Sequence, residues 1–421
     1  MTDETFLKRL FEAYYREKHE EIPKITDFSK REFGFIPFDN SIMIRHIGFR
    51  DKEDLIRYLI KNSPRHVYSS GSLYKYPDAP TMDKKLYQFC DFIIDIDVDH
   101  FYTPCKNDHD FWYCQNCGAQ GSGMIKSCPK CKKKKIDTLT WICNKCLEIS
   151  KEELLKAIYN FLIPDFGIRE EEMHIAFSGH RGYHLKIENN KMRQLSSEER
   201  REIVNFITGH NIDFEVLGFQ VNNKGVTGLL GSNVGWPKKI IDELKKILNE
   251  FNNRKLKSLL ISMGIPEKTS ESFVNSRDYF YKIISNNKAL WSIEGFGKAT
   301  WEILLSGIVE RVGVEIDEPV SIDIHRLIRY PGSLHGKTGF KVQELTFNQI
   351  DDFNPLDEAN SSIDPIVFYS KKNYKLKIIA EMVPRTNIKG EQFGPYQKDE
   401  IIEVPNHIAV LLLSKGVAKI L

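Results

Sequence analysis

Cysteine is concentrated in one short stretch of this 421-residue chain. Seven of its eight cysteines lie between Cys105 and Cys146, and six of these form three Cys-x-x-Cys pairs. The stretch has no long apolar periodicity, so it needs a metal or the support of the rest of the chain in order to fold. Ten residues separate the first two pairs, a spacing typical of a zinc ribbon or knuckle. The sequence therefore predicts a zinc-binding module at about 103–147.

Two sets of zinc ligands can be drawn from this stretch. The preferred set consists of Cys114, Cys117, Cys128 and Cys131. A second or alternative set consists of Cys105, His109, Cys143 and Cys146. Zinc in either set would be structural, because four protein ligands leave no open coordination position. Disulfides are the alternative, but we find no signal-peptide pattern and no apolar stretch of membrane-spanning length, so we expect a reducing cytoplasm and no membrane association.

An apolar run, Phe92–Ile94, leads directly into the triplet Asp95-Ile96-Asp97. Because side chains alternate along a strand, both carboxylates of this triplet point to one face. Carboxylate oxygens suit a hard cation such as Mg²⁺, which completes its coordination with water and substrate phosphates. The pattern predicts a metal-binding strand, with solvated acids at a strand end as the alternative. Asp99 alternates onto the same face, but we do not expect it to be a ligand.

The segment from Phe177 to Lys186 follows the apolar pair Ile175-Ala176 and predicts a strand, a tight turn and a second strand. Its glycines would let the backbone approach an anion. Ser178 offers a hydroxyl, Arg181 a planar fork that suits phosphate, and His184 a hydrogen-bond donor. An ordinary hairpin with exposed polar side chains is the alternative.

A third segment, from Ile322 to Gly339, begins with an acid that we expect on a short apolar strand. This acid, Asp323, could complete a carboxylate triad. The cationic or donor side chains of Arg329, His335 and Lys337 follow around a Pro-Gly turn. Such an arrangement could bind a triphosphate while metals act on the reacting oxygens.

In their order along the chain, these three segments resemble the small catalytic subunit of the archaeal and eukaryotic DNA primase. The N-terminal pieces Arg31-Glu32-Phe33, Ile44-Arg45-His46 and Val67-Tyr68-Ser69-Ser70 are similar as well. One departure is Ile94, where relatives often have Phe. By this resemblance, the second cysteine and histidine set could be the family's usual zinc site, with the middle pairs as an inserted ribbon.

The resemblance implies a two-metal mechanism with Mg²⁺ or Mn²⁺ bound by Asp95, Asp97 and Asp323. It implies that the phosphates of the incoming nucleotide contact Ser178, Arg181, His184, Arg329, His335 and, less directly supported, Arg45. The expected reaction is the synthesis of short RNA primers, or also DNA primers, on single-stranded DNA from nucleoside triphosphates. The expected partner is the primase large subunit in a heterodimer, in the cytoplasm of an archaeal cell at the replication fork.

The overall composition is compatible with one large core and a smaller subdomain. By the resemblance we expect an α+β primase core, with a mixed sheet flanked by helices. Its predicted parts are a first core segment (1–190), a connecting segment (191–235), an inserted helical subdomain (236–312), the rest of the core (313–345) and a C-terminal cap (346–421). The helical subdomain is indicated by apolar residues at helical spacing, beginning with Ile240, Ile241, Leu244, Ile247 and Leu248.

Charge adds little to the functional prediction, because 60 basic residues nearly balance 58 acidic ones. Any grip on DNA must therefore be local, and the basic run Lys130–Lys135 is a candidate for it. Three alternative functions remain open: a nuclease, a repair- or plasmid-type primase-polymerase of the same superfamily, and a non-catalytic zinc-ribbon scaffold that binds DNA.

Overall fold

The computed structural model describes residues 2–222, 225–229, 234–357, 363–370 and 372–421. The chain divides into two compact units. Unit 1 comprises Met1–Leu154, Glu170–Arg200 and Ile316–Leu421, and unit 2 comprises Leu155–Arg169 and Arg201–Glu315. The α+β fold class is confirmed. The strand pairings among the described residues are antiparallel, however, so the sheets are not mixed in direction as we expected.

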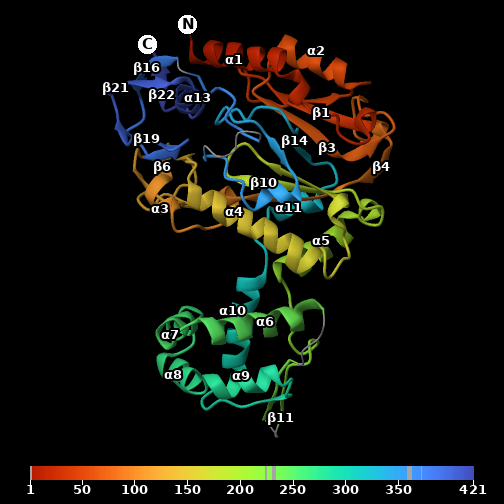
Figure 1. Ribbon diagram of the computed structural model, residues 1–421, viewed down its shortest axis with the longest axis vertical. Coiled ribbons are helices and arrows are strands. Elements are labelled where there is room, and N and C mark those ends of the chain that lie inside the picture. The colour runs from red at the N-terminus through yellow and green to blue at the C-terminus, as the bar shows by residue number, and fades with distance from the viewer. Residues whose placement is uncertain (1, 223–224, 230–233, 358–362, 371) are drawn as a thin grey trace. The chain divides into compact units, whose positions relative to one another are not determined.

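The first sheet of unit 1 has the strand order β14-β3-β1-β2, and β4 also pairs with β3. Its strands are β1 (Arg31–Ile36), β2 (Ile44–Ile47), β3 (His66–Tyr74), β4 (Tyr87–Cys90) and β14 (Leu327–Arg329). Helices α1 (Asp3–Glu17) and α2 (Lys52–Asn62) contact each other and lie on one side of this sheet (Figure 1). Aromatic packing joins the two layers, since the ring centroids of Phe35 and Tyr58 are 4.4 Å apart.

The second sheet carries the predicted metal-binding strand at one edge. Its order is β15-β9-β10-β5, with β5 (Phe92–Asp97), β9 (Met173–Phe177), β10 (Gly182–Ile187) and β15 (Gln343–Leu345). Alternate residues of β5, namely Phe92, Ile94 and Ile96, are fully buried. Burial of this apolar face fixes the opposite face for Asp95 and Asp97, as the alternation predicted. The short helix α11 (Glu318–Ile322) contacts β5.

The cysteine-rich segment forms a small sheet with the order β7-β6-β8. Its elements are α3 (Lys106–His109), β6 (Phe111–Cys114), β7 (Gln120–Ser122) and β8 (Ile136–Leu139), and α4 (Asn144–Lys156) follows. The side chain of Trp141, just after β8, is buried and donates a hydrogen bond to Thr386 near the C-terminus. The module is therefore tied to the C-terminal part of unit 1.

The C-terminal part of unit 1 begins with α12 (Phe347–Ile350) and contains a sheet with the order β21-β16-β22. The strands are β16 (Asn373–Ile378), β21 (Ile401–Pro405) and β22 (Ala418–Ile420), with two small hairpins, β17 (Met382–Val383) with β20 (Tyr396–Gln397) and β18 (Thr386–Ile388) with β19 (Glu391–Phe393). Helix α13 (Asn406–Ser414) is buried along its whole length. Lys415 follows it directly, where the helix ends before Gly416.

Unit 2 is mostly helical. Its described residues include most of α5 (Ser197–Thr208), a three-stranded sheet and the helices α6 (Gly235–Glu250), α7 (Asn253–Ser262), α8 (Glu267–Asn275), α9 (Arg277–Ser285) and α10 (Lys298–Val312). The sheet consists of β11 (Gln220–Asn222), β12 (Gly225–Thr227) and β13 (Leu290–Trp291). Unit 2 is larger than the predicted 236–312 subdomain because Trp236 packs against Phe161 and Phe206 from earlier segments. None of the described helices is both long and apolar enough to cross a membrane.

Candidate active site and metal centres

Asp95 and Asp97 are partly buried and lie on the face of β5 opposite Phe92, Ile94 and Ile96. His184 of β10 is paired in register with Asp95, and its Nε2 lies 3.4 Å from Asp95 Oδ1. Among the described residues, this Oδ1 is buried without a hydrogen-bond partner. Burial, with the neighbouring carboxylates of Asp97 and Asp317, raises the pKa of Asp95 well above its usual value. A bound divalent cation would keep these acids ionised, so the donor set fits a metal.

Asp317 is the acid that the structure brings beside Asp95. Its backbone N–H donates to the backbone oxygen of Asp95 at 2.8 Å, and its carboxylate lies 3.5 Å from the ring of His100. Sequence analysis missed this residue. The signal was present, because Asp317-Glu318-Pro319 is an acid followed by a proline in the first helical turn, which is typical of a helix start.

Asp323 is not on a strand, and this prediction was wrong. It is the exposed residue that follows the last turn of α11, and its Oδ1 accepts a 2.8 Å hydrogen bond from the backbone N–H of His325. Strand β14 begins only at Leu327. The alternation of apolar residues around Asp323 suggested a strand, but the helix start upstream determines the local structure.

The turn between β9 and β10 has the predicted strand-turn-strand form. The backbone N–H of Ser178 donates to the carbonyl of Gly182 at 2.9 Å, and Ser178 itself is buried. Gly179 has φ +83°, and a Cβ built on it would lie 2.7 Å from the Cβ of His335. Glycine is therefore needed here for both conformation and space. The close approach lets the rings of His180 and His335 stack, with centroids 5.2 Å apart and an interplanar angle of 8°.

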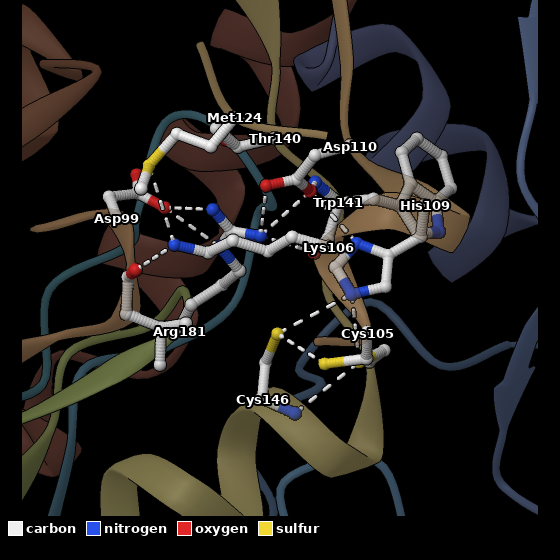
Figure 2. A network of polar contacts seen from close by, with 12 residues as sticks. Asp99, Cys105, Lys106, His109, Asp110, Met124, Thr140, Trp141, Cys146 and Arg181 are labelled. Carbon is white, nitrogen blue, oxygen red and sulfur yellow. Dashed lines mark hydrogen bonds and ion pairs between the residues drawn. The ribbon is translucent and has the colours of Figure 1, made fainter. Parts of the chain in front are cut away.

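Arg181 does not present its guanidinium to this turn. The side chain is buried, and every guanidinium nitrogen has a protein acceptor (Figure 2). Nε donates to Asp99 at 2.8 Å, and Nη1 donates to both carboxylate oxygens of Asp110 at 2.8 and 2.9 Å. The predicted phosphate contact does not agree with this geometry. The sequence motif identified the guanidinium but could not identify its distant carboxylate partners.

Arg329 and His184 meet between the two sheets. Together with Ser69 of β3 and Lys186 they line a small cavity of about 40 Å³. Nη1 of Arg329 lies 2.7 Å from Nδ1 of His66, and its guanidinium lies over the ring of Tyr68. The cavity thus combines two basic side chains, Arg329 and Lys186, with the carboxylate of Glu344 and with hydrogen-bonding groups.

Arg45, another predicted nucleotide contact, lies on β2 with its side chain one-third exposed. It donates to both carboxylate oxygens of the buried Glu32, at 3.0 and 3.2 Å. A further hydrogen bond of 3.2 Å reaches the backbone oxygen of His325. Arg45 is therefore anchored on the first sheet, next to the segment that leads into β14.

Both predicted sets of zinc ligands are assembled. In each set, the four ligand atoms lie within 4.8 Å of one another: Cys114, Cys117, Cys128 and Cys131 in the ribbon, and Cys105, His109, Cys143 and Cys146 beside α4. All these cysteines are free thiols, so the disulfide alternative is not supported. Four soft donors at such distances suit a tetrahedral metal such as zinc. Hence two metal centres can form, one from each set of ligands.

Comparison with known proteins identifies the family. A family model described as DNA primase small subunit matches residues 134–347, half of the chain. The DNA primase small subunit PriS of Methanothrix thermoacetophila is 30% identical over 441 residues, which cover 99% of this chain and 98% of the relative. That of Methanococcoides burtonii is 31% identical over 432 residues, with 98% and 97% covered. That of Methanosarcina barkeri is 29% identical, with 98% and 96% covered.

The chain belongs to the DNA primase small subunit family. The resemblance inferred from the motifs is confirmed, and the protein is a DNA primase, a nucleotidyltransferase. This assignment favours nucleotidyl transfer over the alternatives of a nuclease and a non-catalytic scaffold. The designation as a small subunit also implies a large subunit as partner.

Lys415 is a second residue of this primase subunit that sequence analysis missed. Its buried Nζ lies 2.7 Å from Nε2 of His180 and donates to the backbone oxygen of Thr140 at 2.6 Å. Burial, with Arg181 and Lys337 nearby, lowers the pKa of Lys415 to about 7. In the sequence, the Lys-Gly pair after α13 indicates only a helix end.

Four buried histidines of the primase site, His66, His180, His184 and His335, are neutral near pH 7. Burial lowers the pKa of His184 to about 3, and the cationic Arg329 adds to this effect. Burial also lowers the pKa values of His66, His180 and His335 well below the usual range, with further contributions from Arg329 and Lys337. Positive charge in this site must therefore come from arginine and lysine side chains.

Proposed function

We propose that this primase subunit synthesises short RNA primers, and also DNA primers, on a single-stranded DNA template by two-metal nucleotidyl transfer with release of pyrophosphate. The main support is the buried Oδ1 of Asp95, which has no hydrogen-bond partner among the described residues and lies beside further acids. A buried carboxylate in this situation is stabilised by a metal far better than by solvent.

Asp95 and Asp97 would hold Mg²⁺ or Mn²⁺, and one further acid would complete the set. The sequence pattern proposes Asp323, whereas the hydrogen bond to Asp95 favours Asp317. Bound metal ions would lower the pKa of the attacking 3′-hydroxyl and stabilise the negative charge on the departing pyrophosphate.

The chain's own residues would bind the triphosphate. Ser178 and the Gly179 turn offer a hydroxyl and close backbone, and Arg329 and Lys337 supply positive charge. His184 and His335 are neutral and can each donate one N–H without competing for the acids. Arg45, held by Glu32, would be a further nucleotide contact, whereas the guanidinium of Arg181 is occupied by Asp99 and Asp110.

The remaining partners are also proposals. The exposed run Lys130–Lys135, beside the ribbon cysteines, is suited to contact the phosphates of the template strand. The centres formed by the two cysteine-containing sets would hold structural zinc. By its family, the subunit would act with a large subunit in the cytoplasm of an archaeal cell at the replication fork.

Synthesis on unprimed single-stranded DNA with labelled nucleotides and Mg²⁺ or Mn²⁺ tests the proposal. Wild type is compared with a variant carrying both Asp95→Ala and Asp97→Ala, with and without the large subunit. Metal-dependent products from wild type alone are expected. Extension of a supplied primer without initiation, even with the large subunit, would instead indicate a repair- or plasmid-type primase-polymerase. Equal products from both proteins would exclude this site.

A further inference from the structure

In the metal centre beside α4, the histidine ligand is hydrogen-bonded to a neighbouring carboxylate. Nε2 of His109 lies 3.2 Å from the sulfur of Cys143 and 3.4 Å from that of Cys146, so Nε2 is the ligand atom. The other ring nitrogen, Nδ1, lies 2.8 Å from Oδ1 of Asp110. When Nε2 binds a metal, Nδ1 carries the ring proton, and this N–H donates a hydrogen bond to the carboxylate of Asp110. A carboxylate held in this way fixes the orientation of a metal-binding imidazole.

Asp110 is also the partner of Arg181. The buried carboxylate accepts both hydrogen bonds from Nη1 of Arg181 and a 2.9 Å hydrogen bond from the backbone N–H of Trp141. Its Oδ1 is thus shared between His109 of the metal centre and Arg181, while its Oδ2 contacts Arg181 alone (Figure 2). A shift of the His109 ring would therefore disturb a carboxylate that also accepts hydrogen bonds from Arg181 and Trp141.

On its other side, Arg181 holds the segment that directly follows β5, the strand that carries Asp95 and Asp97. Nε donates to Asp99, and the backbone N–H of Asp99 donates to Oδ1 of Asp97 at 2.9 Å. The backbone oxygen of Arg181 accepts a 3.3 Å hydrogen bond from Val98. Lys106, next to the ligand Cys105, adds a hydrogen bond to the backbone oxygen of Phe101 at 2.6 Å. A continuous hydrogen-bonded path therefore runs from the metal centre to the catalytic strand.

We propose that Asp110 and Arg181 are positioning residues, through which the Cys105, His109, Cys143 and Cys146 metal centre fixes the orientation of the Asp97 carboxylate. The inference deepens the proposed function, because it relies on Asp97 as a ligand of the catalytic metal. It assigns Arg181 a role different from the phosphate contact that its motif suggested.

The ribbon centre provides an internal comparison. The hydrogen bonds that the structure gives to Cys114, Cys117, Cys128 and Cys131 remain within the ribbon. The ribbon cysteines pack with Trp112, Ala119, Ile125 and Ile136, also within this module. Loss of metal from the ribbon should therefore leave Asp97 in place, whereas loss from the other centre should not.

The test measures Mn²⁺ binding to the full chain by electron paramagnetic resonance, without nucleotide, together with zinc content and steady-state kinetics. Asp110→Asn and Arg181→Lys should each weaken Mn²⁺ binding about tenfold or more and lower kcat, with a smaller change in KM for nucleotide. Cys143→Ser should lose one equivalent of zinc and weaken Mn²⁺ binding similarly. Cys117→Ser, the matched control in the ribbon, should lose one equivalent and bind Mn²⁺ as wild type does.

Two results would overturn the inference. Unchanged Mn²⁺ affinity in Asp110→Asn and Cys143→Ser would show that the two sites are independent. A large rise in KM for nucleotide in Arg181→Lys, with normal Mn²⁺ affinity, would restore the phosphate contact. Circular dichroism and melting curves check folding, and Asp110→Asn keeps the side-chain shape if the other variants are unstable. If wild type makes no primers, the proposed function fails, but the Mn²⁺ titrations still decide this inference.

Discussion

Replacement of Lys415 by methionine should change how the stability of unit 1 depends on pH. The ammonium group of Lys415 is buried against His180 and the backbone of Thr140, with no carboxylate within ion-pair distance among the contacts described for it. Burial lowers its pKa to about 7 in the folded protein. Methionine has a similar length and carries no titratable group, so the variant isolates this one effect.

The sign follows from proton binding. Between about pH 7 and pH 10.5, the unfolded chain holds a proton on Lys415 that the folded chain has released. Folding therefore becomes more favourable as the pH rises through this window, by at most about 1.4 kcal/mol per pH unit. The free-energy penalty for burying the charged Lys415 side chain is largest below the pKa of this group in the folded protein. From pH 7 to pH 9, wild type should gain about 2 kcal/mol in unfolding free energy relative to Lys415→Met.

Urea unfolding at both pH values measures this difference, read from the transition that the substitution shifts. Lys419→Met, at an exposed position on β22, is the control and should leave the pH dependence of wild type unchanged. The reasoning would be refuted if the difference in unfolding free energy between wild type and Lys415→Met were the same at both pH values, or changed in the opposite direction. The side chain would then be solvated or paired in a way that the contacts do not indicate.

Three further outcomes are expected. Asp317→Ala should lower primer synthesis at least about a hundredfold and Asp323→Ala much less, in side-by-side assays with saturating Mn²⁺, and the reverse ranking would support the sequence-based triad. Gly179→Ala should cost more than about 1 kcal/mol in urea unfolding, because a Cβ would lie 2.7 Å from a histidine, whereas Gly416→Ala, with φ +68° but open space, should cost less. Cys128→Ser should release one equivalent of zinc and make residues 111–139 sensitive to protease, and an intact, protected ribbon would exclude a metal there.

Local patterns predicted those parts of the site that depend on local structure. Alternation placed Asp95 and Asp97 on one face of a strand, and the strand-turn-strand pattern placed His184 on the second strand of a hairpin. Cys-x-x-Cys spacing identified the ribbon set, and the fold brings together the four residues of this set and those of the second set. These features can be predicted from short sequence patterns because residues close together in the sequence determine them.

Other features depend on contacts between distant segments and could not be read from the motifs. The guanidinium of Arg181 suits phosphate and carboxylate equally, and only the fold brings it to Asp110, 71 residues away in the sequence. Lys415 reaches His180 across 235 residues. The error at Asp323 has a different cause, because Asp317 and Pro319 gave a local helix-start signal that outweighed the strand pattern.

The neutral charge of His184 explains how acids and cations can share this narrow site. An imidazolium at this position, 3.4 Å from Asp95, would form an ion pair with the carboxylate and compete with a metal for the same oxygen. Burial and the nearby guanidinium of Arg329 hold the pKa of His184 at about 3, so the ring stays neutral near pH 7. Asp95 therefore remains available to a metal, while Arg329, on the other sheet, remains available to an anion. Neutral His184 thus separates the acidic part of the site from its cationic part.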